Sequence, residues 1–197
     1  MRLRASPSAA SSRITSTRLY LGNIQAVLSR DFSLDDDKRD PEMHQTRKGN
    51  QWYFGLKAHI GVDSKEGVVH SVCTSAASVA DKHMLPDLLH GEERKVWGDG
   101  GYQGQTEAIH EAAPHAQDMT CRRTKFKNYV DEEAKRKNTT KSKVRAKVEH
   151  VFRILKRVFG FDRVRYRGIA KNHHRLCANF ALINLYLHRK RLAVLGA

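Results

Sequence analysis

The sequence predicts a layered α/β domain, and two observations carry that prediction. Residues 51–62 alternate between apolar and polar side chains, as in a strand with one buried face, whereas residues 141–159 repeat apolar side chains at helical spacing. Strand patterns come first along the chain and helix patterns come last, so helices are expected to pack on a sheet. A chain of 197 residues is long enough for one domain with a core.

The first 40 residues differ in composition from the rest. The opening stretch "MRLRASPSAASSRITSTR" is rich in Ser and Arg and poor in large apolar side chains, so residues 1–40 are expected to be disordered or non-native. The folded domain is expected over residues 41–192, followed by a C-terminal tail at 193–197.

Each element inside the domain follows from a local pattern. The residues "DSKEG" predict a turn after the 51–62 strand, and "VVHSVCTS" predicts its antiparallel partner. Pro86 limits the length of a helix within residues 78–89. The remaining elements are a short strand with a glycine-rich loop at 95–104, a helix at 106–113, a strand at 116–123, a charged connector at 131–143, the long helix at 141–159, and a last helix that carries Leu176, Phe180, Ile183 and Leu187.

Charge is distributed unevenly along the chain. Up to Thr120 there are 14 basic and 16 acidic residues, whereas from Cys121 onward there are 22 basic and 5 acidic ones. An excess of this size favours binding to a polyanion, although a merely basic surface of the ribosomal type is the alternative. Three scattered cysteines fit a reduced cytoplasmic setting, and no apolar run approaches the ~18–20 residues of a membrane span.

Two carboxylates are candidates for metal chemistry. Asp99 follows a predicted strand in "WGDGGYQG", where flanking glycines would let a bulky charged ligand approach, although "GDGG" is also an ordinary turn. Glu149 is the only acid in "RAKVEHVFRILK". If both converge on a phosphodiester they would bind Mg²⁺ or Mn²⁺, and the basic Lys156 would hold the DNA backbone. The alternative for Glu149 is a solvated ion pair with Arg145 or Arg153, four residues away on either side.

Three blocks of the sequence, in the same order, resemble the DDE-type transposases of bacterial insertion sequences, nearest to the insertion-sequence-five families. They are "RDPEMHQTRKGNQWYFGLKAHIGVDSKEGVVHSV", "VWGDGGYQG" and "RAKVEHVFRILKRVFGF". The resemblance covers residues 39–192. It places the second catalytic Asp on Asp99 and the signature Arg, Glu and Lys on Arg145, Glu149 and Lys156.

The resemblance implies an RNase H-like mixed sheet flanked by helices. It also implies two divalent metals, Mg²⁺ or Mn²⁺, held by three carboxylates, of which Asp99 and Glu149 are two. The partners would be double-stranded DNA at the insertion-sequence ends and at the target, with a homodimer or an intact transposase as a further partner. The place of action would be the bacterial cytoplasm, at the nucleoid. Lys57 and His59 would lie near bound DNA on the exposed face of their strand, and the alternative for His59 is a solvent-facing residue without a role.

The sequence departs from the family pattern in two places. Ser142 stands where the signature usually has a Tyr. More importantly, the hydrophobic strand that carries the first catalytic Asp is expected to be missing, since Asp31, Asp35, Asp36 and Asp37 lie in a polar, irregular stretch. Neither Asp63 nor Asp81 is a convincing substitute.

These departures predict a chain that is truncated at its N-terminus or frame-shifted, and a transposase that retains DNA affinity with impaired cleavage and strand transfer. The alternatives are a catalytically inactive DNA-binding fragment that inhibits an intact transposase, and a gene remnant without a stable fold.

Overall fold

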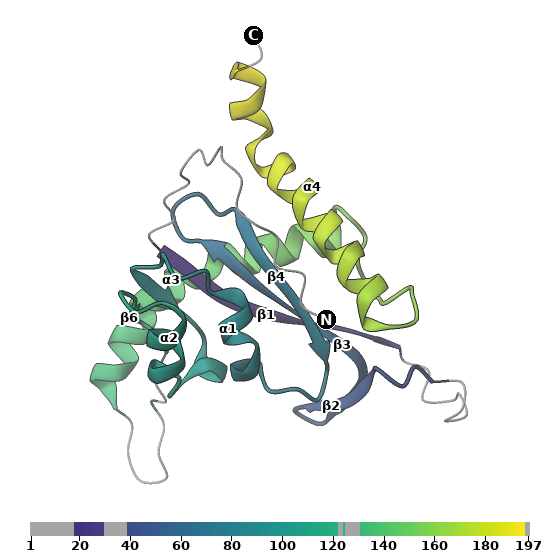
Figure 1. Cartoon of the computed structure of the whole chain (residues 1–197), viewed down its shortest axis with the longest axis horizontal. Helices are drawn as coiled ribbons and strands as arrows, with labels where there is room; N and C mark the ends of the chain where they lie inside the picture. Colours follow the sequence, from purple (N-terminus) through teal and green to yellow (C-terminus); the bar gives the residue numbers. More distant parts are fainter. Residues whose placement is uncertain (1–17, 30–38, 122–123, 125–130, 196–197) are drawn as a thin grey trace.

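The computed structural model describes residues 18–29, 39–121, 124 and 131–195, with the side chains of residues 18–29, 48, 140–145 and 195 left out of the description. Within this part of the chain a mixed six-stranded sheet lies between two layers of helices (Figure 1). The strands are β1 (Arg18–Ser29), β2 (His44–Lys48), β3 (Gln51–Asp63), β4 (Val69–Ala76), β5 (Lys95–Trp97) and β6 (Gln117–Asp118). The helices are η2 (Asp81–Met84), α1 (Leu85–Leu88), η3 (Gly100–Tyr102), α2 (Thr106–Ala112), α3 (Glu132–Arg157) and α4 (Ile169–Leu195).

Strand β3 organises the sheet because it pairs along both of its edges. One edge is antiparallel to β1, and the other is antiparallel first to β2 and then to β4. Beyond β1 the sheet continues with β5 and β6, each parallel to its neighbour. Strand β1 therefore lies in the middle of the sheet, between an antiparallel and a parallel partner.

Strand β1 contradicts two expectations: that residues 1–40 contain no folded structure, and that the first strand is missing. Residues Arg18–Ser29 pair with β3 and with β5. The stretch "RLYLGNIQAVLS" has no charged residue after Arg18 and contains five Leu, Ile and Val residues, a composition that suits a strand in the middle of a sheet. Ser- and Arg-rich residues before it and acidic residues after it dominate the composition of 1–40 and hide this signal. Asp31, Asp35, Asp36 and Asp37 lie outside the described residues.

The strands predicted at 51–62 and 68–75 are confirmed as β3 and β4. The charged connector predicted at 131–143 is instead the first half of α3. Asp131 caps this helix by accepting a hydrogen bond from the Ala134 N–H at 2.9 Å, and Lys137 pairs with Glu133 one turn earlier. A favourable cap and the Lys137–Glu133 pair at i,i+4 spacing therefore stabilise the first half of α3, which carries almost no apolar residues.

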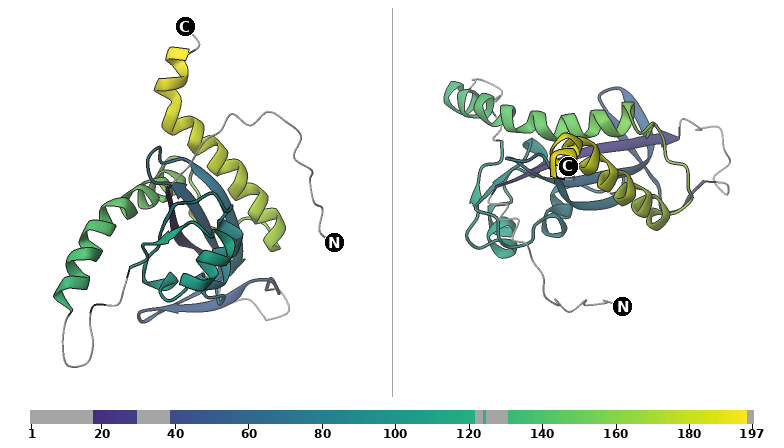
Figure 2. Two further views of the ribbon diagram at one scale, coloured as in Figure 1. Left: turned by 60° about the vertical axis from the view of Figure 1, so that its left-hand side comes forward. Right: turned by 90° about the horizontal axis from the view of Figure 1, so that it is seen from above.

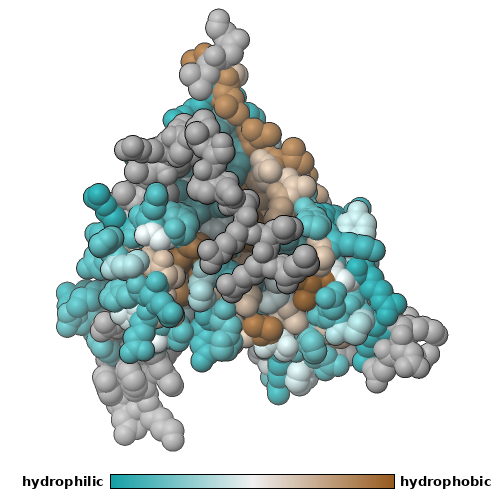
Figure 3. All heavy atoms as spheres, in the orientation of Figure 1, coloured by the Kyte–Doolittle hydropathy of each residue, from teal (hydrophilic) through white to brown (hydrophobic). Residues whose placement is uncertain are grey.

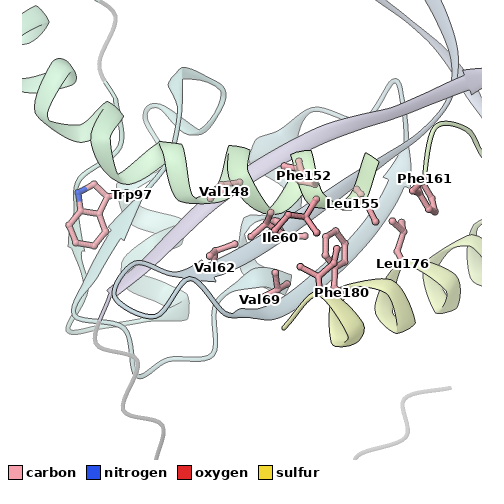
Figure 4. Packing of buried hydrophobic residues seen from close by; sticks show 14 residues of the cluster. Ile60, Val62, Val69, Trp97, Val148, Phe152, Leu155, Phe161, Leu176 and Phe180 are labelled. Carbon is pink, nitrogen blue, oxygen red and sulfur yellow. The ribbon is translucent and has the colours of Figure 1, made fainter. Parts of the chain in front are cut away.

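The two faces of the sheet are covered by different helices. Helices α3 and α4 contribute Phe152, Leu155, Leu176 and Phe180 to a core cluster with Ile60 of β3, as Figure 4 shows. The opposite face packs against α1 and α2. That smaller cluster consists of Leu85, Leu88, Val96, Tyr102, Ile109, Ala113 and Ala116. Seen from above, α3 runs along one side of the strands and α1 and α2 lie on the other (Figure 2).

Helix α4 is anchored at its N-terminus and projects beyond the sheet at its C-terminal end (Figures 1 and 2). Asp40 accepts a hydrogen bond from the Gly168 N–H at 2.5 Å, and Glu42 accepts one from the Ile169 N–H at 2.8 Å. The C-terminal half of α4 exposes apolar side chains, among them Leu182, Leu185, Leu192 and Val194. Figure 3 shows hydrophobic residues along the upper part of the molecule. Among the described residues, no helix combines the length and apolarity that crossing a bilayer would need.

Candidate active site

Asp99 lies two residues after the end of β5, next to the central strand. Its carboxylate caps the short η3 helix by accepting a hydrogen bond from the Gly101 N–H at 2.9 Å. The turn must be tight, because a Cβ at Gly98 would lie 3.1 Å from the Cβ of Tyr102. The predicted glycine-rich loop is therefore needed for close packing, and it leaves the Asp99 side chain half-buried at the edge of the sheet.

The register between β1 and β5 shows which residue of the central strand accompanies Asp99. Tyr20 pairs with Trp97 in the parallel ladder. Strand β5 ends at Trp97, and extending the same register by two residues aligns Gly22 with Asp99. The whole of β1 contains no Asp or Glu. The central strand therefore brings no carboxylate to the end of β5.

Asp81, for which no catalytic role was predicted, lies beside Asp99. A Cβ at Gly101 would come within 3.0 Å of Asp81 Oδ2 and 3.1 Å of Asp99 Oδ1, so both carboxylates border the same glycine. Asp81 is already paired, since its Oδ1 accepts a hydrogen bond from Lys57 Nζ at 3.2 Å. Its sequence signal, an Asp at the start of a helical segment, indicates a helix start and gives no hint of this neighbour.

The prediction that Lys57 and His59 lie on an exposed strand face is wrong. Lys57 is 8% exposed and His59 is 0% exposed, because η2 and α1 pack over this face of β3. Lys57 Nζ also donates to the carbonyl oxygen of Val79 at 2.8 Å, and His59 Nε2 lies 2.9 Å from Ser75 Oγ. Burial is the main cause that lowers the pKa of His59 to about 4, so its ring is neutral at pH 7. Both residues are part of the packed interior.

Glu149 lies on the exposed side of α3, one residue after the buried Val148. Val148 and Trp97 belong to one core cluster, and Figure 4 shows both at the same end of it. Helix α3 contacts both β1 and β5. Glu149 and Asp99 therefore stand on elements in contact, each within two residues of a member of the same cluster.

Two basic residues predicted for DNA contact share this helix. Lys156 is exposed and lies seven residues, or about two turns, after Glu149, so the two side chains share a face of α3. Arg145 lies one turn before Glu149, and its side chain is outside the described part. The face that carries Glu149 and Lys156 is thus a solvent-facing surface with acidic and basic groups.

Among the described residues, no three-carboxylate metal site is complete. The described residues contain no group of three or more His, Cys, Asp or Glu side chains that could hold a metal ion. Asp99 and Glu149 offer oxygen ligands of the kind that Mg²⁺ and Mn²⁺ prefer, but β1 has no acid to join them. Asp81, which borders Gly101 together with Asp99, is engaged by Lys57.

Residues 23–185 match the family model of the transposase DDE domain. The chain belongs to that family. The match begins inside β1 and ends within α4, so this transposase domain includes the central strand and both long helices. No solved structure matches the chain significantly.

Proposed function

We propose that this transposase-family chain binds DNA and is impaired in metal-dependent cleavage and strand transfer. The observation that carries the proposal is the central strand β1, which has no acidic residue where it passes Asp99. Phosphodiester cleavage by two metal ions depends on ligands that fix both ions on either side of the reacting phosphorus. Asp99 and Glu149 alone would hold a divalent cation weakly, because they supply two of the three expected carboxylates.

An RNase H-like architecture is supported by the order of the strands. Two antiparallel pairings, β4 with β3 and β3 with β1, are followed by two parallel ones, β1 with β5 and β5 with β6. The acidic positions Asp99 and Glu149 fall after the first parallel strand and on the helix that crosses it. Membership in the insertion-sequence-five group remains part of the proposal and is supported by the three motif blocks. A shifted reading frame in the N-terminal stretch is supported by the absence of an acid from β1.

DNA binding is supported by the charge of the C-terminal part of the chain. Helix α4 contains no acidic residue, and α3 presents Lys156 and Arg153 to solvent. Cations grouped in this way displace counterions from DNA, so affinity should fall steeply with salt. The sites would be double-stranded insertion-sequence ends and target DNA, encountered at the bacterial nucleoid.

A protein partner is supported by the exposed apolar side chains of α4, such as Leu182 and Leu185, which are 50% and 57% exposed. Such a patch is typical of an interaction site. The partner would be a second copy of the chain or an intact transposase. In the second case this chain would act as an inhibitor of the intact transposase. Sedimentation of the chain alone and together with an intact transposase separates the two cases.

A gain-of-function experiment tests the impairment most directly. The proposal expects the natural chain to bind duplex DNA carrying the ends that flank its gene, without cutting it in Mg²⁺ or Mn²⁺. Gly22→Asp would supply a carboxylate in register with Asp99 and should produce Mn²⁺-dependent nicking. Gly22→Asn, which has the same size and no charge, should not.

Robust Mn²⁺-dependent cleavage by the natural chain, abolished by Glu149→Gln, would contradict the proposed impairment and point to an active transposase. Loss of all DNA binding in a chain that still unfolds cooperatively would contradict the DNA-binding part. A chain with no cooperative unfolding transition would instead be a gene remnant.

A further inference from the structure

The β2–β3 hairpin carries two arginine–aromatic pairs on one face. Arg47 pairs with Trp52 across the two strands, and Gln45 pairs with Phe54 in the same way. Residues two apart on a strand share a face, so Trp52 and Phe54 lie on the same side of the hairpin. The Arg47 guanidinium carbon lies 5.8 Å from the centroid of the Trp52 ring, and that of Arg39 lies 5.9 Å from the Phe54 ring.

The turn of the hairpin holds the Arg47–Trp52 pair in place. Residues Gly49 and Asn50 connect the strands, and Gly49 has a φ of 61°, a conformation that few other residues adopt easily. Arg47 Nε donates to the Gly49 carbonyl at 3.0 Å, and its terminal nitrogen donates to Asn50 Oδ1 at 3.4 Å. The guanidinium is thereby fixed beside Trp52, which is 51% exposed. An indole of this size, half in solvent and backed by a fixed cation, is not needed for the core.

The second pair, Arg39 and Phe54, lines a cavity of about 470 Å³. Its lining includes Phe54, Gln45, His44, Arg39 and Arg167. Arg167 comes from the segment before α4 and donates a hydrogen bond to the Arg39 carbonyl at 3.4 Å. The cavity is therefore built from two distant parts of the sequence, and both contribute an arginine.

Two acids, Asp40 and Glu42, lie beside these residues, whereas the hairpin itself carries only basic charges. Residues 43–62 contain no Asp or Glu. The one acid in the cavity lining, Asp40, is occupied, since its oxygens accept hydrogen bonds from the Glu42 N–H at 3.0 Å and from the Gly168 N–H at 2.5 Å. The hairpin also lies at the end of the sheet opposite β6, where Figure 1 shows it at the lower edge of the molecule.

We propose that this arginine–aromatic strip, made of Arg47, Trp52, Gln45, Phe54, Arg39 and Arg167, binds unpaired nucleotides of a DNA strand. The inference rests on the proposed DNA-binding function and names a second contact surface, apart from α3. Trp52 stacks on a base at the tip, the cavity takes the neighbouring nucleotide, and the arginines contact its phosphates. Duplex DNA is a poor fit, because base faces are covered by stacking until the strands separate. A proline-rich peptide would use the aromatic rings but would have no use for three arginines.

The test compares single-stranded and duplex DNA on the full chain. The probes are a 20-nucleotide mixed-sequence oligodeoxynucleotide and the same sequence as a duplex, each followed by fluorescence anisotropy and by tryptophan emission. Of the two tryptophans, Trp52 is exposed and Trp97 is 8% exposed, so stacking should quench the emission of Trp52. Trp52→Ala should weaken binding of the single strand about tenfold or more and leave duplex affinity within twofold. Trp52→Phe, which keeps a ring, should retain most of the affinity.

Tyr53→Ala provides a matched control. Tyr53 follows Trp52 on the same strand and is half-buried, but alternation places it on the opposite face of the hairpin, and it is not part of the cavity lining. This substitution should leave single-strand affinity unchanged. If Trp52→Ala binds the single strand as tightly as the natural chain, or if no quenching accompanies binding, the strip is not a nucleotide site. Duplex binding that persists in that case leaves the proposed DNA-binding function intact, whereas failure to bind any DNA overturns both.

Discussion

Both faces of strand β3 are buried, but one face carries apolar side chains and the other carries polar ones. On one face Ala58, Ile60 and Val62 pack into the apolar cluster under α3 and α4. On the other, Lys57 and His59 are buried with their polar atoms held by Val79, Asp81 and Ser75. Alternation along the strand reveals which residues share a face, but the second face is buried because η2 and α1 cover it. A half-polar strand pattern is thus compatible with burial on both sides.

The largest expected effect comes from the apolar face. The Phe180 ring packs edge to face on Phe152 with centroids 6.1 Å apart, and Phe180 is 1% exposed. Phe180→Ala should lower the free energy of unfolding by about 3–5 kcal/mol, since it removes buried area and leaves a cavity. Urea unfolding followed by circular dichroism measures the loss. Leu185→Ala on the same helix, at 57% exposure, is the control and should cost less than about 1 kcal/mol. Equal losses would show that α4 is not packed as described.

The polar face should be nearly as sensitive to loss of one partner. Lys57→Met leaves Asp81 and the Val79 carbonyl without their donor and should cost about 2–3 kcal/mol. Lys137→Met removes the partner of Glu133 in a pair whose side chains are 67% and 70% exposed, and it should cost less than about 0.5 kcal/mol. Thermal unfolding of the two variants, measured side by side, compares the two losses of stability. A Lys57 variant as stable as the Lys137 variant would mean that the polar face tolerates an uncompensated carboxylate.

Acid should destabilise the polar face through His59. Its pKa in the folded chain is about 4, against 6.5 when unfolded, so the unfolded chain binds one more proton between these values and stability falls as the pH drops from 6.5 towards 4. The loss should be about 2 kcal/mol between pH 6.5 and pH 5. His70, whose pKa is also lowered by burial, contributes in the same direction. His59→Gln should flatten the dependence measured by urea unfolding across this range, and an unchanged slope would exclude His59 as the cause.

The smallest effect concerns the anchoring of α4, on which the apolar face depends. Asp40→Ala removes the acceptor of the Gly168 N–H at the start of this helix and should lower the free energy of unfolding by about 1 kcal/mol. Asp162→Ala, an exposed acid in the loop that leads into α4, is the control and should be close to neutral. Thermal unfolding monitored by circular dichroism provides the comparison. No difference between the two would show that Glu42 alone suffices to cap the helix.

Several elements could be predicted from local sequence patterns alone. Strands β3 and β4 follow from alternation and a turn, and the second half of α3 follows from apolar residues at helical spacing. Strand β1 was missed because its apolar residues are flanked by long polar stretches. The β2–β3 hairpin carries a local signal of its own, a Gly–Asn turn between two strand-like segments. The first half of α3 was missed because a polar helix without an apolar stripe is stabilised by its cap and its charge pairs.

For the candidate site, the sequence by itself determined the chemistry of single positions: an acid after a short strand at Asp99, an acid on a basic helix at Glu149, and no acid in the stretch that becomes β1. Only the tertiary structure decided which groups meet. Three features bring together residues that are far apart in the chain. They are the burial of Lys57 and His59, the approach of Asp81 to Asp99 at Gly101, and the cavity that Arg39 and Arg167 share. Local patterns report the preferences of neighbouring residues, whereas these contacts depend on how sheet and helices pack, which no short stretch encodes.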